Sequence, residues 1–166
     1  CVDVIISDDG MQHYKMARDI ECCIVDSQRR FGNGFVMPAG PLRETTNRLN
    51  SVDLVIENGG GASLSYVLQT GALKHVANNT PVNKTIEKGH AVSAIGNPQR
   101  FEDSLKGQNI QLLSTHHYRD HYAYSMADFT QFNDDNVLMT EKDAVKCRDF
   151  AKDTWYYLPV NAKPTD

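Results

Sequence analysis

The chain has 166 residues, of which 40% are hydrophobic and 23% are charged, with only 11 Gly and 6 Pro. This composition is typical of a folded globular protein and excludes a low-complexity chain. The formal net charge of −4 lacks the broad positive footprint of a nucleic-acid-binding protein. The apolar runs are far shorter than the roughly 20 residues that a membrane-spanning helix needs. The four cysteines show no CxxC or other metal-type spacing, which favours a reducing compartment such as the cytosol.

The first third of the chain has the pattern of a parallel sheet. Short apolar runs that end on acidic residues predict strands at residues 1–7, 21–26 and 52–57. Runs of this kind are typical of parallel strands that are buried on both faces. Before the third run, apolar residues at helical spacing and a Glu44/Arg48 pair predict a helix that Pro41 opens and that extends to Leu49.

The remainder of the chain alternates strands with helices. After Gly61 the sequence is polar and less patterned through Asn83, which indicates a boundary or a connecting ribbon near residues 80–90. Strands are then predicted at residues 90–95, 110–114, 136–139 and 155–160, and helices at residues 98–105 and 125–132. Ser125 is a candidate cap of the second helix. The alternation predicts an α/β architecture in both halves.

Two adjacent carboxylates, Asp8 and Asp9, follow the first predicted strand. A strand of a parallel sheet would deliver them to its carboxyl edge, where α/β proteins bind ligands, and their oxygens suit Mg²⁺. The segment resembles a Walker B strand. An Asp-Gly turn that merely closes a strand explains the same residues, and His13 either faces the same ligand or caps a helix.

A second candidate site combines basic residues with small ones. Arg29 and Arg30 precede a Phe-Gly-Asn-Gly sequence, and Arg43 lies in the first turn of the helix predicted at Pro41. Small residues let the backbone approach an anion, a helix N-terminus offers unpaired N–H groups, and an arginine can fork onto a phosphate. A glycine-rich loop beside a solvated helix is an equally common explanation.

The histidine-rich segment from His116 to His121 is a third candidate. His117 and His121 have the HxxxH spacing of a helical zinc pair, but they follow a strand and lack a positioned third ligand. A histidine oriented by Asp120 or another carboxylate could instead accept a hydroxyl proton near neutral pH. A surface histidine cluster without function stays open as well.

A charged run follows the strand predicted at residues 136–139. Thr140, with Asp143 three residues later, predicts a capped helix that needs no functional explanation. Lys142 and Lys146 share one face of that helix and could contact phosphate.

Six motifs, read together and in order, resemble the tetraacyldisaccharide 4′-kinase family of lipid A synthesis. They are DDGMQH at 8–13, RRFGNG at 29–34, PAGPLRE at 38–44, IGNPQRF at 95–101, RDHYAY at 119–124 and MTEKDAVKC at 139–147. The resemblance implies ATP- and Mg²⁺-dependent phosphorylation of the 4′-hydroxyl of a lipid disaccharide 1-phosphate. It places that reaction at the cytoplasmic face of the bacterial inner membrane. It involves no nucleic acid.

The fold implied by this resemblance is a P-loop-kinase-like parallel sheet with helices, joined by a two-stranded ribbon to a smaller α/β domain. Residues 1–81 then correspond to the C-terminal part of the kinase domain, and residues 82–166 to the ribbon and the smaller domain. No GxxxxGK[ST] sequence occurs in the 166 residues. We therefore expect the phosphate-gripping loop, a partner aspartate and a membrane anchor to precede Cys1, and we expect the 166 residues alone to be inactive.

The resemblance also assigns roles to particular residues. Asp8 and Asp9 take the place of the acidic pair near Mg²⁺, and Gln12 and His13 belong to the same active-site segment. Arg43 and Glu44 match an Arg-Glu site that binds substrate or phosphate, and His121 matches a histidine that acts on the sugar hydroxyl.

Two alternatives belong to other functional classes. One is a metal-dependent hydrolase that uses Asp8, Asp9, His13 and the His117/His121 pair as ligands. The other is a non-catalytic module that binds phosphate or a sugar nucleotide through Arg29, Arg30 and Arg43, with structural acids.

Overall fold

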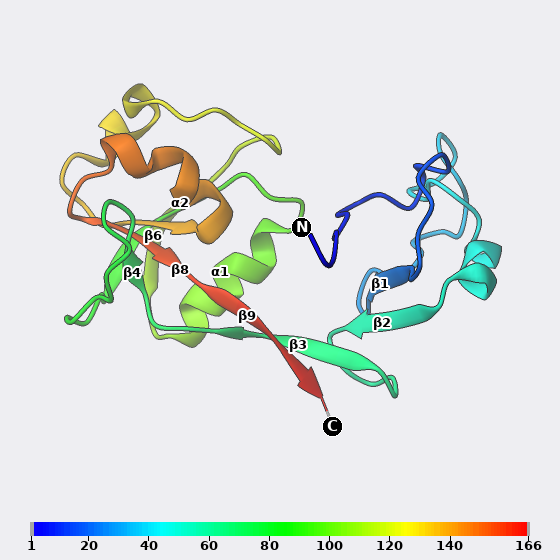
Figure 1. Ribbon diagram of the computed structural model, residues 1–166. Helices are drawn as coiled ribbons and strands as arrows, with labels where there is room; N and C mark the ends of the chain where they lie inside the picture. Colours follow the sequence, from blue (N-terminus) through cyan, green and yellow to red (C-terminus); the bar gives the residue numbers. More distant parts are fainter. Residues whose placement is uncertain (1, 166) are drawn as a thin grey trace. The chain divides into compact units, whose positions relative to one another are not determined.

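The computed structural model describes residues 2–165, which form two compact units (Figure 1). The first comprises the residues up to Leu68 together with those from Ala162 on, and the second comprises Gln69–Asn161. The chain passes between the units within β3 (Ser65–Thr70) and within β9 (Val160–Thr165), which are neighbours in one sheet. The domain boundary that the family resemblance implies near residue 81 stays a prediction.

The first unit is built on a sheet in the order β1-β2-β3-β9. β1 (Cys22–Asp26) and β2 (Leu54–Asn58) pair in parallel, with Cys22 opposite Leu54, and they confirm the strands predicted at 21–26 and 52–57. The prediction of burial on both faces is wrong, because Ile24 is 60% and Val55 41% exposed. Burial on both faces requires helices on both sides, and the described part of this unit has only one short 3₁₀ helix.

The strand predicted at residues 1–7 is not formed. Cys1 lies outside the described residues, and residues 2–7 have no regular secondary structure. The apolar side chains of Val4, Ile5 and Ile6 are 72%, 85% and 90% exposed. A strand requires a hydrogen-bonding neighbour, and none of the strands within residues 2–165 pairs with this segment.

The prediction of a helix from Pro41 to Leu49 is also wrong, in the residue where the helix starts and in the type of helix. A 3₁₀ helix, η1, spans Thr46–Ser51 instead. The main chain of Leu42 is engaged elsewhere, because its N–H donates to Phe35 O at 3.2 Å and its carbonyl accepts from Met37 N at 2.8 Å. These bonds prevent Leu42 from entering a helical turn.

The second unit is built on a five-stranded sheet in the order β4-β8-β7-β5-β6. Its neighbours are parallel except for the antiparallel pair of β4 and β8. The elements are β4 (Lys74–His75), β5 (Lys88–Ser93), α1 (Pro98–Gly107), β6 (Gln111–His117), η2 (Met126–Phe132), β7 (Val137–Thr140), α2 (Glu141–Cys147), η3 (Arg148–Phe150) and β8 (Trp155–Leu158). They confirm the α/β prediction for this half. The helix predicted at 125–132 is a 3₁₀ helix, and β3, β4 and β9 were not predicted.

Two apolar cores lie on opposite faces of this sheet. On one face, Val92 and Met139 pack with residues of η2 and α2, including Phe129 and Cys147. On the other face, Leu138 packs with residues of α1 and with strand residues that alternate with those of the first core. Period-2 alternation along β5, β7 and β8 therefore supplies both cores at once. No helix within residues 2–165 has the length and apolar character needed to span a bilayer.

The buried carboxylate of Asp143 joins α2 to this sheet. Thr140 caps the helix as predicted, because its Oγ1 accepts from Asp143 N at 3.3 Å. The Asp143 side chain, which is fully buried, accepts from Thr140 Oγ1 at 2.7 Å, from Ala94 N at 3.0 Å and from Lys146 Nζ at 3.2 Å. A buried carboxylate with this many donors is satisfied, and its removal would leave those donors unpaired.

We predict that Asp143→Ala lowers the free energy of unfolding by about 3 kcal/mol, because it orphans a buried N–H and the Lys146 ammonium. Urea denaturation at neutral pH measures the change. Asp149→Ala, at an exposed position of η3, is the matched control and is expected to change stability by less than about 0.5 kcal/mol. Equal losses in the two variants would contradict the structural role of Asp143.

The cysteines should differ sharply in reactivity. Burial raises the pKa of the Cys147 thiol to about 12, whereas Cys22 is exposed. Because the thiolate is the nucleophile, we predict that iodoacetamide at pH 8 alkylates Cys22 in the native chain and Cys147 only after denaturation. Peptide mass spectrometry of labelled protein checks this. Comparable native labelling of both thiols would show that the face covered by α2 is open.

Candidate functional site

The acidic pair lies in a turn of the first unit. His13 N donates to Gly10 O at 2.9 Å, Asp9 has a positive φ of 53°, and both Asp8 and Asp9 are exposed. The pair does not sit at a strand tip, because the preceding residues form no strand. The turn instead presents both carboxylates to solvent, where their oxygens are accessible to a ligand.

Arg43 brings a second predicted site segment to this turn. Its Nη1 donates to Asp9 Oδ1 at 2.8 Å and to Gln12 Oε1 at 3.3 Å. The structure therefore places three of the predicted residues together, although Arg43 is more than 30 positions from the other two in the chain. The ion pair is solvent-exposed, with 55% of the Arg43 side chain and 69% of the Asp9 side chain accessible. Exposed pairs of this kind contribute at most about 1 kcal/mol.

Gln12 and His13 border an open hollow. Its volume is about 350 Å³, and its lining residues are Gln12, His13, Tyr14 and Lys15. This hollow combines an amide, an imidazole, a phenol and an ammonium group, so it can contact an anionic or hydroxyl-rich ligand.

Glu44 adjoins the same region but faces inward. Its Oε2 lies 3.5 Å from Arg48 Nε, which confirms the predicted Glu44/Arg48 pair without an α-helix between them. Its Oε1 is buried and receives no hydrogen bond from the described residues. The adjacent guanidinium compensates the charge, and Oε1 keeps an unused capacity to accept a hydrogen bond.

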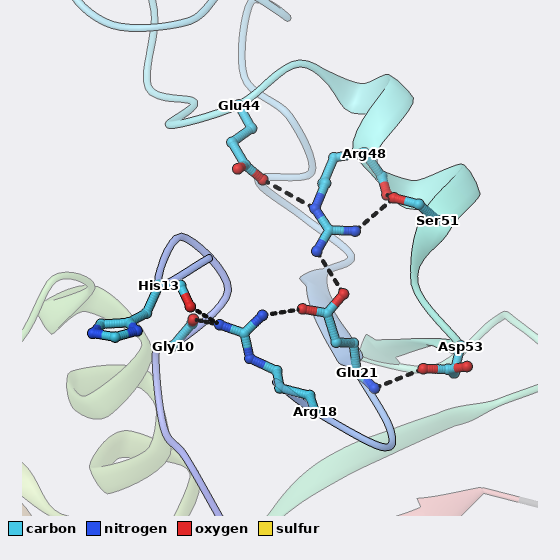
Figure 2. Close-up of polar contacts among 8 residues, drawn as sticks. All are labelled: Gly10, His13, Arg18, Glu21, Glu44, Arg48, Ser51 and Asp53. Carbon is cyan, nitrogen blue, oxygen red and sulfur yellow. Dashed lines mark hydrogen bonds and ion pairs between the residues drawn. The ribbon is translucent and has the colours of Figure 1, made fainter. Parts of the chain in front are cut away.

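A network of charged side chains lies between Gly10 and His13 of the turn and Glu44 (Figure 2). Glu21 accepts from Arg18 Nη1 and from Arg48 Nη2, both at 2.5 Å. The hydrogen bond from Arg48 holds the pKa of Glu21 below its ordinary value. This network is not among the features predicted from the sequence. The Arg18/Glu21 spacing is a weak signal for it, and the contact between Glu21 and Arg48 has no local signal.

The glycine-rich loop is not followed by the helix on which the predicted anion site depends. Asp26 Oδ1 accepts from Arg29 N at 2.9 Å, Arg30 has a φ of 43°, and both arginine side chains are exposed. Gly32 adopts a φ of 58°, which favours glycine. Because the helix begins at Thr46 rather than at Pro41, Arg43 lies before the helix and not in its first turn. The prediction that a helix N-terminus at Pro41 contributes to an anion site is wrong.

His121 lies in the second unit, in the turn after β6. Its backbone has a φ of 59°, its side chain is 82% exposed, and its Nε2 is 3.7 Å from Asp120 Oδ2. Asp120 Oδ1 accepts from Lys142 Nζ at 2.8 Å and from His121 N at 3.0 Å. The predicted pairing of a histidine with Asp120 is thus present. Lys142 of α2 holds the carboxylate of that pair.

His117 does not pair with His121. Its Nε2 instead contacts Glu102 Oε1 of α1 at 2.6 Å. Within residues 2–165, no three His, Cys, Asp or Glu side chains are grouped so as to hold a metal ion. The alternative of a hydrolase with a shared aspartate-histidine metal site has no support in this geometry. The alternative of a non-catalytic phosphate module has none either, because Arg43 contacts Asp9 while Arg29 and Arg30 lie in a separate turn.

The similarity to known proteins extends over nearly all of this chain. Residues 1–166 match the family model described as tetraacyldisaccharide-1-P 4′-kinase. A tetraacyldisaccharide 4′-kinase of Pseudoalteromonas translucida is 72% identical over 165 residues, which are 99% of this chain and 51% of that protein. The corresponding protein of Mannheimia succiniciproducens is 51% identical over 98% of this chain and 52% of its own length. The chain therefore spans about half the length of the curated relatives it matches.

A solved structure has the same fold. The crystal structure described as the "apo" form of LpxK from Aquifex aeolicus in complex with ATP matches 95% of this chain and 52% of its own, with a TM-score of 0.66 and 22% identity. This likeness confirms the mixed α/β fold of a P-loop kinase type. Since the family model matches every position and a 72%-identical relative covers 99% of the chain, the chain belongs to the tetraacyldisaccharide-1-P 4′-kinase family.

Proposed function

We propose that the protein containing this chain is a kinase that transfers the γ-phosphoryl group of ATP to the 4′-hydroxyl of a tetraacyldisaccharide 1-phosphate in lipid A biosynthesis. The observation that carries the proposal is the family match over all 166 residues. The Arg43–Asp9 contact, which joins two of the family-like motifs in one place, supports it. Phosphoryl transfer requires mainly positioned phosphates, compensated charge and a base near the nucleophile.

Asp8 and Asp9 are the residues that would hold Mg²⁺. They offer exposed carboxylate oxygens, and the Arg43 contact uses Oδ1 of Asp9. Mg²⁺ usually binds one or two carboxylates together with waters and substrate phosphates, so two adjacent acids fit without a third protein ligand. When bound, the ion compensates the negative charge of the phosphates.

Arg43 and its neighbours would bind the anionic parts of the substrates. The guanidinium has five N–H donors, and the contacts with Asp9 and Gln12 both use Nη1. Arg43 can therefore remain beside the acidic turn while it donates to a phosphate oxygen. Gln12 and His13 would contribute from the hollow that they line, and the inward-facing Glu44 would act through its contact with Arg48.

His121 would accept the proton of the 4′-hydroxyl. Its imidazole is exposed, as a group that must reach a bound substrate has to be. Asp120, whose Oδ2 lies 3.7 Å from Nε2, would orient the imidazole for proton transfer. A substrate with four acyl chains resides in a membrane, which leads us to propose that the protein acts at the cytoplasmic face of the inner membrane.

We predict that a chimera in which this chain replaces the matching residues of the Pseudoalteromonas translucida relative is active. The assay is ATP-dependent phosphorylation of tetraacyldisaccharide 1-phosphate. Asp9→Asn in the chimera should lower kcat by at least about 10²-fold, because it removes charge near the phosphates. Asp19→Asn, at another exposed aspartate, is the matched control. The 166-residue chain alone should be inactive in the same assay. A chimera without activity would refute the proposed function.

The Asp120 carboxylate provides a pH-dependent prediction. The hydrogen bond from Lys142 holds the pKa of Asp120 below its ordinary value. The ion pair therefore stabilises the fold above the ordinary aspartate pKa, and this contribution disappears as the pH falls through the lowered one. We predict that Lys142→Met raises the pKa of Asp120 toward its ordinary value, as measured by NMR titration of the carboxyl carbon. Lys146→Met, whose ammonium contacts Asp143, should leave that pKa unchanged.

A further inference from the structure

Glu21 occupies the centre of a partly buried chain of ion pairs in the first unit (Figure 2). Its two carboxylate oxygens are held by different guanidinium groups, those of Arg18 and Arg48, each at 2.5 Å. The three side chains are only 16–19% exposed, so solvent screens these contacts far less than it screens the exposed Arg43–Asp9 pair. Glu21 therefore links the acidic turn to the segment of Arg43 more strongly than the exposed Arg43–Asp9 ion pair does.

At one end of this series of ion pairs, Arg18 binds backbone carbonyls of the acidic turn. Its Nη2 donates to His13 O at 2.9 Å and also to Gly10 O. Gly10 directly follows Asp9, and the two carbonyls flank Met11 and Gln12. The turn has no helix or sheet hydrogen bonds, so the Arg18 guanidinium supplies side-chain hydrogen bonds that fix its position.

At the other end, Arg48 holds the segment that contains Arg43. Its Nε lies 3.5 Å from Glu44 Oε2, and its Nη1 donates to Ser51 Oγ at 2.5 Å. One guanidinium thereby ties the Arg-Glu segment to Glu21.

Glu21 is itself anchored to the sheet. Its backbone N–H donates to Asp53 Oδ2 at 2.7 Å, and its carbonyl accepts from Asp53 N and Leu54 N at 3.0 and 3.1 Å. Both site segments are thus attached, through one carboxylate, to the start of β2.

We propose that Glu21, through Arg18 and Arg48, is a positioning residue for phosphoryl transfer: it sets the placement of the acidic turn relative to Arg43. This inference rests on the proposed function. Two formal positive and two formal negative charges balance within Arg18, Glu21, Arg48 and Glu44, so the network is neutral as a unit. Removing the Glu21 charge leaves two adjacent guanidinium groups that repel each other and release both ends.

The test uses the active chimera with Glu21→Gln. The amide preserves size but cannot accept from both guanidinium groups, because its –NH₂ faces one of them. We expect kcat to fall by about 10²-fold, as a displacement near 1 Å can cause, with a smaller effect on KM. Glu57→Gln, the same substitution in β2 outside the network, should leave kcat within about twofold. An unchanged kcat in Glu21→Gln, or an equal loss in Glu57→Gln, would overturn the proposal.

A second readout is independent of activity. Hydrogen exchange of the 166-residue chain, followed by mass spectrometry, should accelerate in Glu21→Gln within residues 8–16 and 41–50, and not in β5 to β8. Uniform acceleration across both units would indicate global destabilisation and overturn the positioning role. Because this measurement needs no turnover, it separates failure of the network from failure of the proposed function, which the unmodified chimera tests.

Arg18→Lys keeps the measurement decisive should Glu21→Gln fail to fold. Lysine retains the positive charge beside Glu21 but lacks the fork that reaches two carbonyls of the turn. We expect a loss of kcat with faster exchange confined to residues 8–16. Full activity in Arg18→Lys would show that charge alone, and not placement of the turn, is required, which would contradict the inference.

Discussion

The contact of one carboxylate with two guanidinium groups organises the first unit. Glu21 joins segments that have little regular structure of their own, the acidic turn and the stretch around Glu44, to the start of β2. Neither segment has an extensive apolar core beneath it, since Val25 and Ser65 are the buried residues of this unit within the described chain. Where apolar burial is scarce, satisfied polar contacts determine the local structure.

The second unit is organised differently. Its sheet has apolar side chains on both faces, and α1 and α2 cover opposite sides. A carboxylate is again decisive, but Asp143 acts inside the core, where it connects the cap of α2 to the end of β5. The same connection places Lys142 beside Asp120, and through it orients the turn of His121. A rigid scaffold thus presents an exposed imidazole, as catalytic loops on rigid folds commonly do.

Membership of the kinase family gives these features a common chemical meaning. The acids and Arg43 belong to the first unit and His121 to the second. Charge compensation at the phosphates and proton acceptance at the hydroxyl are separate tasks in phosphoryl transfer.

Much of the fold could be predicted from local sequence. Two of the errors, at residues 1–7 and 41–49, arise because the structure of a segment depends on which other segments its backbone bonds to. The apolar runs of β1, β2, β5, β7 and β8 are each long enough to indicate a strand, and Thr140 marks the start of α2 by its own side chain. The run at residues 2–7 has the same pattern but no neighbour to pair with. Leu42 lies in a helix-like pattern, yet its backbone bonds to Phe35 and Met37.

The sequence by itself determined the α/β class, the Thr140 cap of α2 and, through six ordered motifs, the family. Only the tertiary structure decided that Glu21 meets Arg48, 27 residues away, and that Arg43 meets Asp9, 34 residues away. Local patterns encode backbone preference and which face is apolar, because those depend on near neighbours. Which charges become partners depends on how distant segments are brought together, and no periodicity in the chain records that.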